Sequence, residues 1–230
     1  DHLGLCNHIA GWMAFVKGDI YEARRQAESA LKHVLESLEG SSFPESLNRF
    51  ALAQVLYEQR NCDEAEHHLA RARQVSEEMN SSLLEYMCSL LQASLAFRQG
   101  QEENGLQFLR HAMVLGRTRG FVNFPWWSPS MMARLCEKAL EAGIESEYVQ
   151  YLIKKRQLRP DPPRVEVAEW PWAIKIYTLG HFNIIVDGKP VRFSRKAQQR
   201  PLNLLQALIA FGGQEVAEAT LTDALWPDAE

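Results

Sequence analysis

The sequence predicts a mostly α-helical protein, a stack of helical hairpins followed by a small β-ribbon with two more helices. Three observations lead to this fold class. Small and aromatic residues recur at a nearly constant spacing in the first half of the chain. A segment rich in proline and tryptophan follows at 159–173. After it, β-branched and aromatic residues alternate with polar ones around an Asp-Gly turn, as in a β-hairpin.

The composition is that of a globular protein. The 230 residues are 46% hydrophobic and 23% charged, which allows one or two domains with proper cores. The net charge of −4 gives no overall attraction to nucleic acid, so any basic surface must be local. Because the chain begins at Asp1 and not at Met, it is expected to be a piece of a longer protein.

The cysteines and the hydropathy bear on the cellular compartment. Four cysteines lie far apart without a CxxC pair, each in an apolar helical context, and we interpret them as buried, reduced thiols. No apolar run reaches the ~18 residues of a membrane span, and no signal peptide is present. The sequence therefore predicts a cytoplasmic protein that does not contact a membrane.

The internal repeat is the clearest signal in the sequence. Phe15, Tyr57 and Phe97 are almost evenly spaced along the chain. Four sets of mostly small residues recur in step with them: Gly11, Ala53 and Ala93; Ala23, Ala65 and Gly105; Ala27, Leu69 and Leu109; Ala30, Ala72 and Ala112. Small residues where two helices cross let the backbones approach, and an aromatic ring fills the groove beside them.

Each copy is predicted to be a helix, a short polar turn and a second helix. The turns are at 16–19, 59–63 and 98–101, and breaker clusters at 39–44 and 80–82 separate the copies. A fourth, less regular pair of helices is expected at 128–142 and 145–158. About eight helices thus make a domain at 1–158, stacked as a short right-handed solenoid with a concave groove.

Trp126 and Trp127, adjacent residues beside two prolines, are the most unusual feature of this domain. Two hypotheses stay open for them. They line a pocket in the groove where an effector or a partner binds, or they cap the last repeat and seal its core. Because adjacent side chains cannot both face one direction, one of the two is expected to be accessible.

A linker and a second domain are predicted after the repeats. Four prolines in 159–173 block a helix and remove amide donors, so this segment should connect two domains. Three short strands are expected within 174–193, with a hairpin turn at Asp187–Gly188. Ser194 offers an N-cap for the next helix, which ends at Gly212–Gly213, and a further short helix follows.

These residues carry a resemblance to known families. The repeat pattern resembles the tetratricopeptide repeat, in particular the array of the large maltose-regulator-like transcription factors. The words "LGHFNIIVDGKPV", "SRKAQQRPLNLLQALIA" and "LTDALWPDAE" resemble, in order, the opening half of the OmpR-type winged helix of the bacterial transcriptional activators, such as the antibiotic-pathway regulators. One departure is Ala217, where that family usually has a capping residue.

The resemblance implies a partial winged-helix domain at 174–230 that lacks the recognition helix and the wing. It further implies a fragment of a cytosolic bacterial transcriptional activator that acts in signal transduction. The repeats would sense a protein or small-molecule effector in their groove, and the winged helix would bind DNA in the full-length protein. Relatives carry an NTPase module upstream, but this chain has no P-loop, so no cofactor is assigned to it.

A local basic cluster accompanies the predicted winged helix. Five basic residues and no acid occur between Lys189 and Arg200. The candidates for contact with DNA phosphate are Arg192, Arg195, Lys196 and Arg200. The alternative interpretation, a solvated turn between a strand and a helix, stays open.

One alternative function fits the same residues, and one function class does not. The alternative function is a protein–protein interaction scaffold in which the winged helix docks protein instead of DNA. An enzyme is not expected, because the sequence has no GxSxG motif, no metal-ligand spacing and no Gly-rich phosphate loop. His67 and His68 are adjacent on a predicted helix and point about 100° apart, which makes them a poor metal pair.

Overall fold

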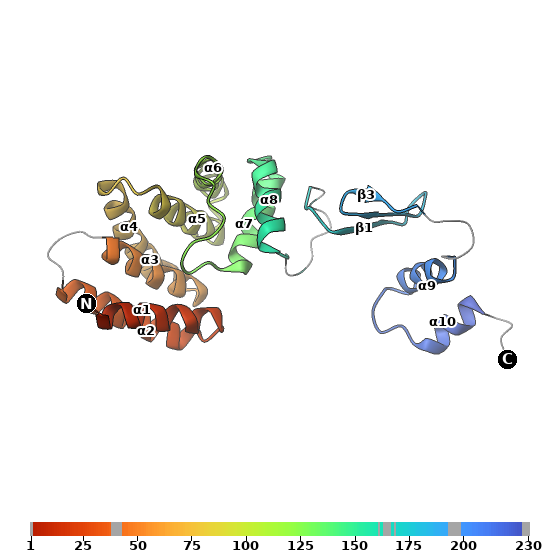
Figure 1. The fold of residues 1–230 in the computed structure, drawn as a ribbon, viewed down its shortest axis with the longest axis horizontal. Helices are drawn as coiled ribbons and strands as arrows, with labels where there is room; N and C mark the ends of the chain where they lie inside the picture. The colour runs from red at the N-terminus through yellow and green to blue at the C-terminus, as the bar shows by residue number, and fades with distance from the viewer. Residues whose placement is uncertain are drawn as a thin grey trace. The chain divides into compact units, whose positions relative to one another are not determined.

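A computed structural model describes residues 2–37, 43–160, 162, 167, 169–192 and 199–226. Within these ranges the chain is mostly helical, with ten helices and one small antiparallel sheet (Figure 1). The chain divides into two compact units, an N-terminal unit at Asp1–Pro171 and a C-terminal unit at Trp172–Glu230. The mostly helical fold class predicted from the sequence is confirmed.

Eight helices make up the N-terminal unit: α1 (His2–Val16), α2 (Ile20–Ser37), α3 (Phe43–Glu58), α4 (Cys62–Glu78), α5 (Ser82–Arg98), α6 (Glu102–Arg119), α7 (Pro129–Glu141) and α8 (Ser146–Arg156). Consecutive helices pair as hairpins, and α2 and α4 also pack on the first helix of the next hairpin. The hairpins therefore follow one another in chain order, from red to green in Figure 1.

The repeated small residues lie where the helices of a hairpin cross. Ala30, Ala72 and Ala112 are fully buried at equivalent positions of α2, α4 and α6. The third copy has Gly105 where the others have alanine, and its packing shows why. A Cβ at Gly105 would come 2.5 Å from the Phe97 ring, so the position of this ring in α5 requires a glycine opposite.

Local signals end and begin these helices. Gly120 adopts the left-handed conformation (φ 70°) and terminates α6, a role for which glycine has no steric cost. Ser128 caps α7, its hydroxyl accepting from the amide of Met131, and Pro129 follows at the first helical position. These residues fix both ends of the segment that joins α6 to α7.

The prediction of four buried thiols is only half right. Cys88 and Cys136 are buried, and desolvation raises the pKa of the Cys88 thiol to about 12. Cys6 is exposed and Cys62 is half-buried, which corrects the prediction for those two. Cys62 opens α4 beside a turn, and Cys6 lies on an exposed side of α1.

The proline-rich segment packs partly on the N-terminal unit. Val167 and Trp170 are buried, and the Gln150 side chain of α8 donates to the carbonyl of Glu169 (3.0 Å). Burial of an indole gives this end of the segment a large apolar contact. Trp170 thus docks the end of the segment on this unit.

The C-terminal unit begins with a three-stranded antiparallel sheet of β1 (Ile174–Tyr177), β2 (Asn183–Val186) and β3 (Lys189–Pro190), in that order. Val186 pairs with Lys189, so the connecting loop consists of Asp187 and Gly188. Both have positive φ (49° and 77°), as a type I′ hairpin turn requires.

Two helices complete this unit, α9 (Gln199–Ala210) and α10 (Glu218–Leu225), which pack on each other. Pro201 lies in the first turn of α9, where its missing amide costs no helical hydrogen bond. In these two ranges no residue is buried. A winged helix buries an apolar helix face against its ribbon, so the predicted winged helix is not confirmed. Ser194, the predicted N-cap of the first of these helices, lies outside the described residues.

Candidate functional site

The three main hairpins are α1–α2, α3–α4 and α5–α6. A segment at 120–128, which we call the covering segment, crosses the first helix of each of them. Trp126 contacts Phe15 of α1, with ring centroids 5.5 Å apart. Phe124 contacts Phe50 of α3 at 6.0 Å and Tyr86 of α5 at 5.9 Å. We call this side of α1, α3 and α5 the inner face. The chain therefore covers its own inner face with an aromatic segment.

A buried polar network fixes Trp126. Its indole N–H donates to His8 Nε2 (3.2 Å), so the proton of the neutral imidazole is on Nδ1, which donates to Asn48 Oδ1 (3.0 Å). The Asn48 amide in turn donates to the carbonyl of Pro44 (2.8 Å). Desolvation lowers the pKa of His8, although the bond to Asn48 acts in the opposite direction. The fold therefore favours the neutral form that can accept from Trp126.

A second network fixes the other end of the segment. The Tyr148 hydroxyl of α8 donates to the carbonyl of Phe121 (2.6 Å) and lies 3.3 Å from the Tyr86 hydroxyl. Desolvation raises the pKa of Tyr148 to about 12 and raises that of Tyr86 further. Gly116 makes room for this pair, because a Cβ there would come 2.8 Å from the Tyr86 ring. Both hydroxyls therefore stay protonated and serve as positioning groups.

A pocket of about 400 Å³ opens beside the covering segment. Trp127 is one wall, with the Arg156 guanidinium of α8 5.1 Å from its ring centroid. Trp12 from α1 and the carboxylate of Glu58 from α3 are further lining groups, and Glu58 accepts from Ser128 (3.0 Å). Two indoles beside one cation and one anion can hold an apolar or a charged side chain of a peptide.

The structure separates the two tryptophans that the sequence singled out. Trp126 is fully buried and packs in the core, as the capping hypothesis describes. Trp127 is also mostly buried, yet one side of it lines the pocket. Binding of an effector or partner at these residues stays a prediction.

The predicted phosphate contacts lie in the C-terminal unit. Arg192 and Arg200 are exposed there. Arg195 and Lys196 lie outside the described residues, so the four side chains are not brought together by what the structure describes. Contact with DNA phosphate by this cluster stays a prediction.

Sequence reasoning missed His8 and Arg156 as members of the site. A signal for His8 exists, since Phe50 and Leu90 are apolar at the equivalent positions of the later copies. A second signal is Gly11, where later copies have alanine, because a Cβ there would come 3.0 Å from the Trp126 ring. No pattern in the sequence connects the cation Arg156 with Trp127.

Comparison with known protein families gives a match over the repeats. A family model described as cohesin loading factor matches residues 7–127, just over half of the chain. The chain belongs to the cohesin loading factor family. The match starts at residue 7, within α1, and ends at Trp127, so it spans most of the three main hairpins and of the covering segment. No curated protein and no solved structure matches the chain.

The interpretation as a bacterial transcriptional activator is wrong. The match to cohesin loading factors overturns that recognition and the function as a bacterial regulator, and with them the interpretation of the C-terminal unit as the DNA-binding winged helix of such a regulator. The physical reason is that evenly spaced small and aromatic residues are needed wherever helical hairpins stack, so they do not identify one family. A two-residue hairpin followed by an amphipathic helix is similarly common to many folds.

Membrane-spanning helices and metal sites are two further features to consider in the described ranges. In these ranges no helix is long and apolar enough to cross a membrane. The same ranges contain no group of three or more His, Cys, Asp or Glu residues placed to hold a metal ion. Absence of a cofactor and of catalysis stays a prediction.

Proposed function

We propose that this chain is a protein-interaction scaffold that binds a protein partner in cohesin loading. The observation that carries the proposal is the family match over residues 7–127, which coincides with the stacked hairpins. Helical repeats of this kind present extended surfaces to other proteins and need no catalytic group. The recurrence of Phe15, Tyr57 and Phe97 supports a tetratricopeptide-like solenoid as the form of the scaffold.

The covered inner face determines where a partner meets the scaffold. Trp126 and Phe124 already fill the position that a bound peptide would take along α1, α3 and α5. The pocket beside Trp127 stays accessible at the edge of this face, and Val16, 70% exposed, extends its apolar rim. We place a partner side chain in this pocket, because buried aromatic anchors with a neighbouring arginine dominate many interfaces.

The domain organisation is part of the same proposal. We retain repeats at 1–158, a linker at 159–173 and a separate domain at 174–230, and the division of the chain into two compact units supports a separate C-terminal domain. The four thiols, none of them in a disulfide, support a reducing compartment such as the cytoplasm.

Binding of purified cohesin to the purified chain tests the proposal. We expect a Kd of roughly 1 µM or below, weakened about tenfold by Val16→Glu and by Arg156→Glu at the pocket. Lys155→Glu is the matched control, since Lys155 precedes Arg156 on α8 and is exposed without lining the pocket. No binding at 100-fold higher concentration would overturn the scaffold function. An equal loss of affinity in the Lys155→Glu control would overturn the pocket as the place where the partner binds.

A further inference from the structure

A second pocket opens where α4, α5 and α6 meet, and we call it the α4–α6 pocket. Its volume is about 210 Å³. The buried residues that line it are apolar, among them Leu69 and Leu95. Its exposed lining groups include the carboxylate of Glu66 and the side-chain amides of Gln99 and Gln101. An apolar floor with a polar rim suits a long side chain that ends in a charged group.

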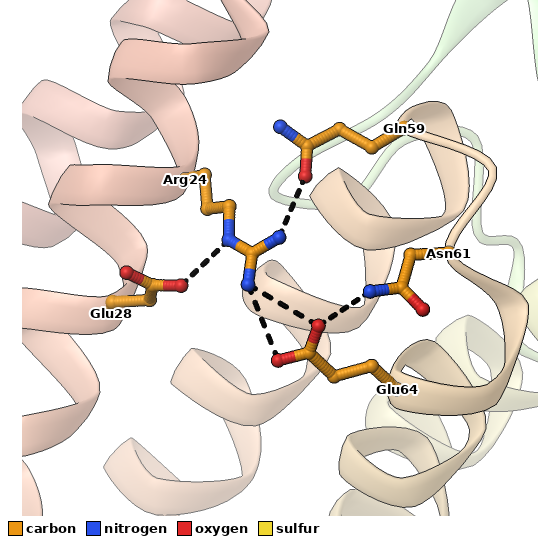
Figure 2. Close-up of polar contacts among 5 residues, drawn as sticks. All are labelled: Arg24, Glu28, Gln59, Asn61 and Glu64. Atoms are coloured by element: carbon orange, nitrogen blue, oxygen red, sulfur yellow. Dashed lines mark hydrogen bonds and ion pairs between the residues drawn. The ribbon is translucent and has the colours of Figure 1, made fainter.

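One repeat earlier, the equivalent position between α2, α3 and α4 holds the guanidinium of Arg24. It donates to Gln59 Oε1 (3.1 Å) at the end of α3. It also pairs with Glu64 of α4 (3.2 Å) and with Glu28 of α2 (2.7 Å). Figure 2 shows the guanidinium lying between these three side chains. The molecule itself therefore contains an example of the group that this position binds.

The repeat alignment shows which parts of this contact the α4–α6 pocket keeps. Gln59 aligns with Gln99, so the amide that accepts from the guanidinium is retained. Arg24 aligns with Glu66, so a carboxylate stands where the earlier copy has its cation. The later copy thus has acceptors for a guanidinium and no guanidinium of its own at this position.

A shorter side chain leaves the pocket open. Glu28 aligns with Ala70, which lines the α4–α6 pocket. The earlier copy places a carboxylate at this position, where it helps to hold Arg24. In the later copy the alanine leaves this space to solvent, so a side chain from outside can enter.

Glu66 supplies the charge of the α4–α6 pocket. Of the described residues that line it, Glu66 alone is charged. Gln99 donates to Glu66 Oε1 (2.5 Å), and Gln101 donates in turn to Gln99 Oε1 (2.9 Å). Within the described part of the chain, no Lys, Arg or His pairs with this carboxylate. Since each amide oxygen keeps a second lone pair, the rim offers a negative charge and further acceptor sites.

Phe108 of α6 makes the pocket more suitable for arginine than for lysine. It lines the pocket and is half-buried, at the position where the earlier copy has His68. A planar guanidinium can stack on an aromatic ring and donate to a carboxylate and an amide in its own plane. An ammonium group is a point charge without this geometry.

We propose that the α4–α6 pocket binds one arginine side chain of a partner protein, with the guanidinium between Glu66 and Gln99 and against Phe108. A cavity of roughly 150 Å³ holds a benzene ring, so about 210 Å³ admits a guanidinium and part of its aliphatic stem. The inference rests on the proposed scaffold function and names the residue type that the partner contributes. Charge complementarity and the example of Arg24 carry it.

The probe is the peptide acetyl-Ala-Ala-Arg-Ala-Ala-amide, titrated into the full 230-residue chain and followed by NMR. We expect the side-chain amide signals of Gln99 and Gln101 to shift, with a Kd on the order of 1 mM for this single side chain. A peptide with citrulline in place of arginine keeps the shape and loses the charge. It should bind about tenfold more weakly, and a lysine peptide about threefold more weakly.

Three variants of the chain examine the contact. Glu66→Gln removes the charge at nearly constant size and should weaken peptide binding about fivefold. Asn104→Glu restores the carboxylate of Glu64, with which Asn104 aligns, and should tighten binding roughly threefold, a gain that misfolding cannot produce. Glu103→Gln is the matched control, because Glu103 is exposed on α6 without lining the pocket. It should leave the Kd unchanged.

Other results of the titration would overturn the proposal. These are no shift of Gln99 and Gln101 at roughly 20 mM peptide, equal binding of the citrulline peptide, or equal losses in Glu66→Gln and Glu103→Gln. A dimer in sedimentation runs that Glu66→Gln dissociates would assign the arginine to a second copy of the chain and not to a partner.

The cohesin assay separates this inference from the scaffold function. Glu66→Gln should weaken cohesin binding about fivefold, whereas Glu103→Gln should not. Unchanged affinity in Glu66→Gln would refute the α4–α6 pocket as a partner contact and leave the scaffold function standing. Absence of cohesin binding by the wild-type chain, with arginine-peptide binding intact, would overturn the scaffold function and leave the arginine pocket.

Discussion

The helices α1 and α3 have the same place in the repeat and differ in what covers them. On α3, even Gln54 and Asn48 are buried, because α2 packs on one side and the covering segment on another. On α1, a more apolar helix, Ile9 and Met13 are largely exposed. The difference teaches that burial in a stacked-hairpin protein is set by the neighbouring hairpin and not by the hydropathy of the helix itself.

The largest expected effect contrasts equivalent residues in two copies. Leu91→Ala should lower the free energy of unfolding by about 2–5 kcal/mol, since it opens a cavity at a fully buried position. Ile9→Ala, at the aligned position of α1, should change it by less than about 0.5 kcal/mol. Urea denaturation of both variants measures the contrast, and equal losses would show that the side of α1 around Ile9 is covered in solution.

The second prediction concerns the covering segment. Trp126→Phe removes the indole N–H that donates to His8 Nε2. Because this imidazole nitrogen is then buried without a donor, the free energy of unfolding should fall by about 1–3 kcal/mol. Trp12→Phe, at a partly exposed indole on the same helix as His8, should cost less than about 0.5 kcal/mol. If the two variants were equally stable in thermal melts, the network around His8 would contribute nothing.

Acidification should destabilise the N-terminal unit through His8. Burial lowers its pKa in the folded state, so the unfolded chain binds the proton first as pH falls through the ordinary value of 6.5. Stability is fully present above pH 6.5 and declines below it, until the pH reaches the lower folded pKa. Desolvation also lowers the pKa of His68, which adds a contribution of the same sign.

The share of His8 in this decline can be isolated. Melting temperatures at pH 7.5 and 5.5 should differ less for His8→Leu than for the wild type, because leucine is the residue at the aligned position 90. The absolute stability of the variant is not the readout. An unchanged difference between the two pH values would assign the whole effect to other groups.

The smallest effect belongs to the polar contact of Figure 2. Arg24→Ala should lower the free energy of unfolding by about 0.5–1 kcal/mol, because the ion pair with Glu64 is partly solvated. Arg25→Ala, which removes an exposed pair with Glu22 inside α2, should leave stability unchanged. The loss for Arg24 should shrink as salt rises to about 1 M, and a loss independent of salt would contradict an electrostatic cause.

The hairpins could be predicted because their determinants are local and repeated. Ala30, Ala72 and Ala112 mark helix crossings that every copy needs, so the spacing alone locates them. The strand pairing around Asp187 and Gly188 is similarly fixed by the chemistry of a two-residue turn. Both kinds of signal lie within the length of a single repeat.

The site could be predicted only in part because its contacts are distant in sequence. Trp127 was singled out, but its neighbour Arg156 comes from another hairpin, and no periodicity links the two. The apolar spacing of α9 correctly predicts a helix, yet none of its residues is buried, because an amphipathic pattern does not specify a packing partner. Assignment to a family failed for the related reason that hairpin packing imposes the same pattern on many families.

The bond between Trp126 and His8 also has a kinetic meaning. Its two ends are 118 residues apart, whereas hairpin contacts join near neighbours in sequence. Repeat arrays can fold from any point and lose one repeat at a time, and they fold fast because their contact order is low. Here His8 of α1 meets its donor only after Trp126, much later in the chain, has been made. We therefore expect this long-range contact to couple α1 to the later hairpins, so that they unfold together and not one repeat at a time.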